Sequence, residues 1–69
     1  MMDKIELAKR IILNPKIITG KPIIRGTRLS VHYILKLLSD GYTLDEILEE
    51  YKDLKKEDII ACLLFASIL

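Results

Sequence analysis

From residue 31 onward, apolar residues recur along the chain at helical spacing. Ser30 is a suitable N-cap for this segment, and Asp40-Gly41 is a suitable end, because glycine tolerates the left-handed conformation that often follows a helix. The pattern therefore predicts a first helix that begins at Val31. Its apolar face, at positions i, i+3, i+4 and i+7, consists of Val31, Ile34, Leu35 and Leu38.

A second helix is predicted after Gly41. Thr43 and Glu46 are spaced as a capping box, in which each side chain bonds the backbone amide of the other residue. Glu49 and Glu50 stand near the end of this helix, where the helix dipole disfavours negative charge, so helix stability does not explain that pair. The apolar stripe of the helix consists of Leu44, Ile47, Leu48 and Tyr51.

A third helix is predicted to start near Lys55 and to run towards Ile68. No serine or threonine stands at its start, so Asp53 is the nearest candidate N-cap. From Ile59 to Ala66 the helix is apolar on every side, and such a helix must be covered all round. We expect a second copy of the chain or a partner protein to complete that cover. The residues that we assign to this interface are Ile59, Ile60, Leu63, Leu64 and Phe65.

The first thirty residues favour extended structure interrupted by turns. Residues 3–9 allow one short helical turn, and Arg10–Leu13 is a predicted strand that the turn dipeptide Asn14-Pro15 ends. Lys16–Thr19 is again prone to extended structure. In Gly20–Ser30, two glycines and a proline interrupt residues that favour extended structure. This pattern predicts two short strands around a tight turn.

These elements predict an α+β fold, mostly α. We expect one domain over residues 1–69, in which a β arm or hairpin (1–30) leads into a three-helix, helix-turn-helix-like unit (31–69). A chain of 69 residues buries only about 60% of the surface that its unfolded form exposes, so its stability is marginal without help. One cysteine and one histidine allow neither an internal disulfide nor a zinc site, which leaves oligomerisation, and we expect a homodimer.

Charge is distributed unevenly, although the formal net charge is only +1. Residues 7–39 contain seven cations and no acid, whereas residues 40–58 contain eight acids and three lysines. We assign the phosphate contacts of a possible DNA complex to four of the cations, and an acidic surface that faces a basic partner to three of the acids. The cations are Lys16, Lys21, Arg25 and Arg28, and the acids are Glu46, Glu49 and Glu50.

Two alternatives to these binding roles stay open. The cations could simply keep a surface hydrated or pair with the acidic helix. Alternatively, the chain could be a small dimeric structural or interaction module. A helix that reads DNA bases is disfavoured, because the second helix is acidic and the third has almost no side chain that could contact a base edge.

Enzymatic activity is not expected. Ser30 is explained as a cap, and Cys62 is predicted to be an inert packing residue. The neighbouring acids Glu49 and Glu50, like Glu57 and Asp58, point apart on a helix and make a poor acid–base pair. We therefore assign no catalytic residue, cofactor, metal or small-molecule substrate. No apolar run is long enough to span a bilayer, so we expect no membrane association and a cytoplasmic location.

One run of the sequence resembles the signature of a known family. The run extends from Asn14-Pro15 through Gly20-Lys21-Pro22 and Gly26-Thr27-Arg28 to Val31, and it is similar to the pattern of the small prokaryotic family called domain of unknown function 433. The resemblance covers roughly residues 10–66. Lys52 and Lys55 depart from it, since the family often has proline and serine or threonine there.

The resemblance implies a fold and a function. It implies a short β element followed by three helices in a winged or homeodomain-like helix-turn-helix, in a protein that is usually a homodimer. It also implies an antitoxin-like protein encoded beside a PIN-like ribonuclease toxin, with possible binding to operator DNA. A stand-alone DNA-binding transcriptional regulator is the alternative. The chain ends almost at the third helix, so we do not expect a disordered tail to neutralise the toxin.

Overall fold

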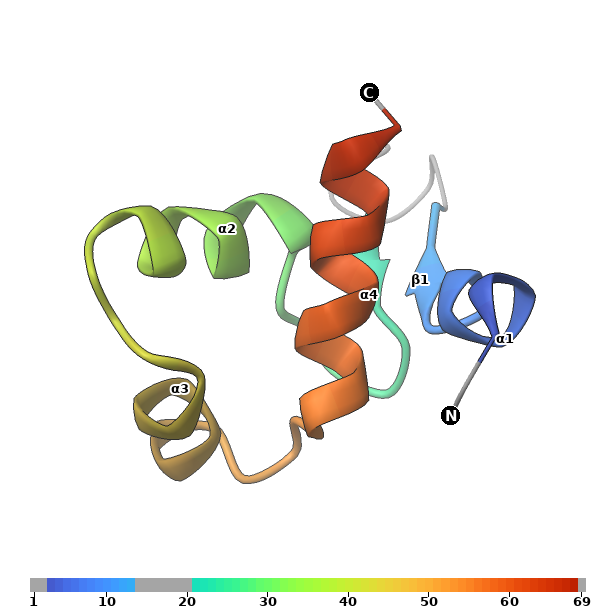
Figure 1. Cartoon of the computed structure of the whole chain (residues 1–69). Coiled ribbons are helices and arrows are strands. Elements are labelled where there is room, and N and C mark those ends of the chain that lie inside the picture. The colour runs from blue at the N-terminus through green and yellow to red at the C-terminus, as the bar shows by residue number, and fades with distance from the viewer. Residues whose placement is uncertain (1–2, 14–20, 69) are drawn as a thin grey trace.

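The computed structural model describes residues 3–13 and 21–68, in which a short helix and a pair of short antiparallel strands precede three further helices (Figure 1). This confirms the predicted α+β, mostly helical fold. The expected turn at Asn14-Pro15 and the extended segment Lys16–Thr19 lie outside the described residues. The elements are α1 (Lys4–Ala8), β1 (Ile11–Ile12), β2 (Ile23–Ile24), α2 (Val31–Ser39), α3 (Leu44–Glu50) and α4 (Lys56–Ser67).

The sheet consists of β1 and β2, which pair antiparallel with Ile11 opposite Ile24. Two strands were expected within residues 20–30, but β2 takes its partner from β1, and its other edge forms only a single bridge between Ile23 and Ser30. The reason is local. Ser30 already caps α2, so the chain turns into the helix before a second strand can form. Gly26 has a φ of +79° in the intervening turn, a conformation that favours glycine.

The caps of α2 and α3 are those that the sequence predicts. The Ser30 hydroxyl accepts a hydrogen bond of 3.0 Å from the amide of Tyr33. Gly41 follows α2 with a φ of +99°. Both bonds of the Thr43–Glu46 capping box are present, at 2.9 and 3.1 Å. These local bonds satisfy amides that have no partner within the helix, and they fix where each helix begins.

α4 begins next to Lys55, where the sequence predicts, but its N-cap differs from the prediction. Its N-cap is Lys55 and not Asp53, and the Lys55 side chain makes no capping bond. Asp58 supplies the bond instead, because its Oδ2 accepts a hydrogen bond of 2.9 Å from the Lys55 amide. The helix therefore begins sharply although Lys55 departs from the capping residue that is common in the family.

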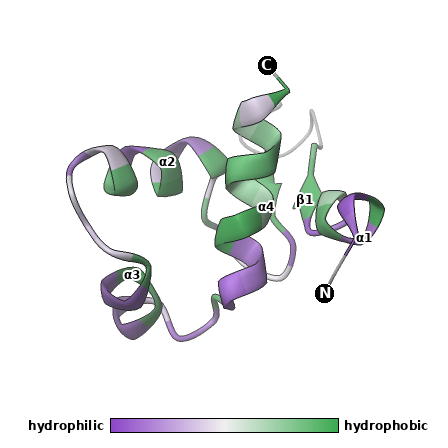
Figure 2. Cartoon of the chain, viewed as in Figure 1, coloured by the Kyte–Doolittle hydropathy of each residue, from purple (hydrophilic) through white to green (hydrophobic). Residues whose placement is uncertain are grey.

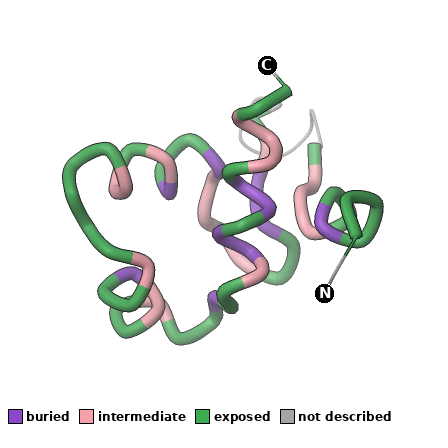
Figure 3. The backbone as a smooth tube through the Cα atoms, in the orientation of Figure 1, coloured by how far each residue is buried: buried purple, intermediate pink, exposed green. Residues whose placement is uncertain are grey.

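The core forms where α4 packs against α1, β1, α2 and α3 (Figure 1). Figure 3 shows buried segments in the turns of α4 nearer its start and exposed segments at both of its ends. The chain thus covers α4 only in part: Ile59 and Cys62 are fully buried, whereas Ile60 and Leu63 remain 37% and 50% exposed. The main core cluster consists of Ile24, Val31, Ile34, Ile47, Leu54, Ile59 and Cys62.

None of the helices in the described part of the chain has the length and hydrophobicity that a membrane span requires.

Candidate functional site

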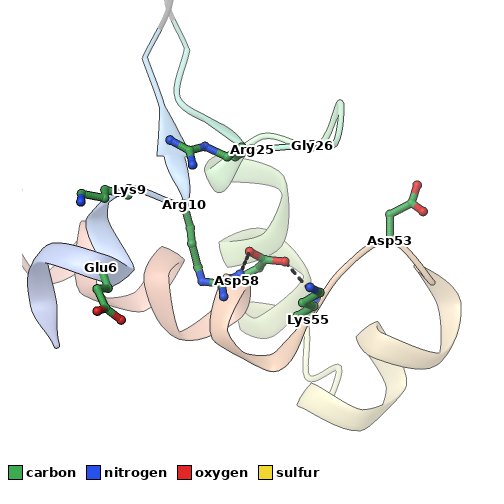
Figure 4. Close-up of a pocket in the computed structure, with 8 residues that line it drawn as sticks. All are labelled: Glu6, Lys9, Arg10, Arg25, Gly26, Asp53, Lys55 and Asp58. Carbon is green, nitrogen blue, oxygen red and sulfur yellow. Dashed lines mark hydrogen bonds and ion pairs between the residues drawn. The ribbon is translucent and has the colours of Figure 1, made fainter. Parts of the chain in front are cut away.

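An ion pair joins the N-terminal arm to the start of α4. Arg10 Nη1 lies 2.9 Å from Asp58 Oδ1, and Asp58 is the one buried charged residue in the described part of the chain, at 5% exposure. Figure 4 shows the Arg10 side chain reaching across to Asp58, which also caps Lys55. Both oxygens of the buried carboxylate therefore accept hydrogen bonds. Arg10, one of the basic residues of the arm, thus serves to stabilise the fold.

The predicted DNA-contacting cations lie around one turn but not in one pocket. Lys21, Arg25 and Arg28 are exposed, and none of them forms an ion pair with an acid among residues 3–13 and 21–68. Lys21 and Arg28 line one hollow, whereas Arg25 lines another together with Lys9 (Figure 4). The cations are therefore divided between two hollows, and the hollow with Arg25 also contains the acids Glu6, Asp53 and Asp58. Lys16 lies outside the described residues.

The three predicted acids lie together on α3. Glu46, Glu49 and Glu50 are exposed and line one hollow of about 530 Å³. The hydrogen bonds that Glu46 makes with Thr43 lower the pKa of its carboxyl. Glu49 and Glu50 form no ion pair or side-chain hydrogen bond within the described residues. Figure 2 shows α3 as the most continuously hydrophilic helix.

The same hollow brings together all three tyrosines of the chain, which the sequence did not single out. Tyr33 on α2 and Tyr51 at the end of α3 meet edge to face, with ring centroids 6.0 Å apart and planes at 86°. Their hydroxyls are hydrogen-bonded to each other. Tyr42, in the turn between the helices, is 51% exposed. The signal that could have found the hollow is the concentration of every tyrosine between residues 33 and 51, beside the acids.

An apolar surface remains on the exposed side of α4. Of the predicted interface residues, Ile60 and Leu63 are exposed, and Leu64 and Phe65 are half-buried. Ile59 lies in the core of its own chain, at 0% exposure, so it is not part of this surface. An apolar hollow of about 250 Å³ continues the surface from Leu64 and Phe65 to Leu13 and Ile68, which are 65% and 73% exposed.

The side chains that could serve in catalysis or metal binding are either engaged in the fold or lie apart from one another. Burial, and then the charge of Asp58, raise the pKa of the Cys62 thiol to about 12, so the sulfur stays protonated at neutral pH. Ser30 is used as a cap. Within the described residues, no three histidine, cysteine, aspartate or glutamate side chains are grouped so as to hold a metal ion.

The fold and these surfaces define a small α+β protein in which a basic hairpin arm docks on a three-helix unit with an acidic helix. The family described as "Protein of unknown function (DUF433)" matches residues 11–66, and the chain belongs to that family. It is also similar to "Uncharacterized protein y4eO" of Sinorhizobium fredii (strain NBRC 101917 / NGR234), with 29% identity over 67 residues. That alignment covers 96% of this chain but only 30% of the relative. No solved structure matches the chain.

Proposed function

We propose that the chain is a cytoplasmic, homodimeric antitoxin-like protein that binds a basic ribonuclease toxin of the PIN-like class. The observation that carries this proposal is the acidic face of α3. Glu49 and Glu50 are exposed at the C-terminal end of the helix, where the dipole disfavours them, and no basic residue stands in its last turn to offset them. Acids that weaken their own helix point to a role in binding.

A ribonuclease is a suitable partner for such a face. The active site of a ribonuclease must attract phosphate and is therefore cationic. An acidic surface that covers this site raises both the affinity and the association rate of the complex. The same face is unsuitable for nucleic acid, because its carboxylates repel phosphates.

The double substitution Glu49→Lys and Glu50→Lys is expected to lower the affinity for the product of the neighbouring reading frame by about tenfold or more, because it places like charges against the basic partner. Calorimetry on the purified proteins measures this. Lysine suits the end of a helix, so the variant should be at least as stable as the parent, and lost binding cannot be assigned to unfolding.

Asp53→Lys is the control for this experiment, since Asp53 is exposed and lies in the connector after α3. It should leave the affinity within about threefold of the parent, a range below 1 kcal/mol. If it weakens binding as much as the α3 variant does, the general charge of the protein and not the α3 face governs the interaction.

DNA binding is the second candidate function, and the exposed cations around the Gly26 turn favour it. Arg25→Ala with Arg28→Ala should lower the slope of log affinity against log salt by about two for the chain's own promoter region, or about one for each phosphate that the variant no longer neutralises. Lys36→Ala, on α2, should leave the slope unchanged. An unchanged slope in the double variant would place any DNA contact elsewhere.

A further inference from the structure

The hollow between α2 and α3 has the form of an aromatic corner. Tyr33 and Tyr51 stand nearly perpendicular, and the bond between their hydroxyls holds the two rings in that arrangement. Tyr42 adds a third ring, and Leu37 and Ile47 complete the apolar part of the lining. The volume of about 530 Å³ falls within the range of about 300–1,000 Å³ that is typical of small-ligand sites.

The charge of this hollow has one sign. Every charged residue that lines it in the described part of the chain is an acid: Glu46, Glu49 or Glu50. The pKa of Tyr51 is raised to about 12, first by its hydrogen bond to Tyr33 and then by burial and by neighbours that include Glu50. The phenol therefore stays neutral at physiological pH, and negative charge is concentrated on the carboxylates beside the rings.

The chain's own cations do not fill the hollow. Arg28 lines two neighbouring hollows, one shared with Tyr33 and Lys21 and the other shared with Tyr51 and Lys52. Glu50 also lines the second of these hollows, but neither Arg28 nor Lys52 lines the hollow that Glu46, Glu49 and Glu50 form together. The tyrosine pair thus lies between hollows that contain cations and the acidic hollow, and no cation among the described residues lines the acidic hollow itself.

Aromatic faces beside carboxylates are suited to a cation. The negative face of a phenol ring attracts an ammonium or guanidinium group, and the planar guanidinium also stacks on the ring and bonds a carboxylate at two points. We propose that the hollow formed by Tyr33, Tyr42 and Tyr51 binds an arginine side chain that the basic protein partner presents to Glu49 and Glu50. This inference rests on the proposed function, to which it adds the contact at the centre of the acidic face.

The site can be tested without the partner. N-acetyl-arginine amide titrated into the protein should shift the tyrosine ring signals in NMR spectra, with a dissociation constant in the millimolar range. N-acetyl-citrulline amide, a neutral compound of nearly the same shape, should produce shifts at least fivefold smaller. Tyr42→Ala should weaken binding of the arginine compound at least fivefold, whereas Tyr42→Phe, which keeps the ring, should stay within twofold of the parent. Tyr42 is half exposed, so neither change disturbs the core.

Failure of the site and failure of the proposed function give different results. The proposed arginine site would be refuted if the citrulline compound gave equal shifts, or if Tyr42→Ala had no effect on binding of the arginine compound. This holds even if the neighbouring gene product still binds. If the arginine compound binds as expected and the neighbouring product does not bind at all, the arginine site stands and the antitoxin proposal fails. In a complex that does form, Tyr42→Ala should weaken binding about as much as it weakens binding of the small probe.

Discussion

Replacing Asp58 by alanine is expected to lower the free energy of unfolding by about 3 kcal/mol, which is roughly a hundredfold in the folding equilibrium. The change removes the Asp58 carboxylate from beside Arg10, whose side chain is only 25% exposed, and it removes the bond that caps α4 at Lys55. Removing one partner of a buried pair is more damaging than removing both, because the remaining charge stays poorly hydrated. Urea denaturation followed by circular dichroism measures the effect.

Two further variants separate the causes of this loss. Asp58→Asn keeps an acceptor for the Lys55 amide while it removes the charge, so its destabilisation should fall between zero and that of Asp58→Ala. Lys36→Ala breaks the exposed pair with Asp40, whose side chains are 61% and 50% exposed, and should cost less than about 0.5 kcal/mol. If Asp58→Ala is no more damaging than Lys36→Ala, the contact between Arg10 and Asp58 does not hold the arm in place.

The second large effect is expected on self-association. The parent protein should sediment at micromolar concentration with about twice the chain mass of 7.9 kDa. Leu63→Asp should raise the dimer dissociation constant by about a hundredfold, because it places a carboxylate in the apolar surface of α4 that a second copy would cover. Leu63 is half exposed in the single chain, so the fold should be retained.

Ser39→Asp is the matched control, since it adds the same charge at the exposed end of α2. It should leave the sedimentation behaviour unchanged, and circular dichroism should show the same helix content in all three proteins. A parent protein that sediments as a folded monomer would remove the argument for a dimer, whatever the variants do.

The two middle helices were the most predictable part of the fold. Ser30 and the Thr43–Glu46 box act over three residues, and the apolar stripes of α2 and α3 repeat over two turns, so all of this information is local. The start of α4 near Lys55 was predicted, but its cap was not, because the capping acceptor, Asp58, lies inside the helix. Asp58 accepts a hydrogen bond from the Lys55 amide, and this role cannot be recognised from the type of residue at the N-cap position.

Predicting the candidate sites required tertiary contacts, which the spacing of residues in the sequence does not give. The acids of α3 could be found from their unfavourable place at the end of a helix. The concentration of all three tyrosines between residues 33 and 51 is a signal for the aromatic corner, but the contact between Tyr33 and Tyr51, 18 positions apart, forms only in the folded chain. Likewise, Arg25 and Arg28 were grouped by sequence distance, but the Gly26 turn places them in different hollows.

The pair of Arg10 and Asp58 has a further consequence, for the order in which the chain folds during synthesis. The two residues are 48 positions apart, and a ribosome releases the arm long before it releases the first turn of α4. A contact of that separation forms late, since a long loop must close first. Until α4 has been made, the basic arm therefore has no α4 to dock on. Docking of α1 and β1 thus waits for the synthesis of α4.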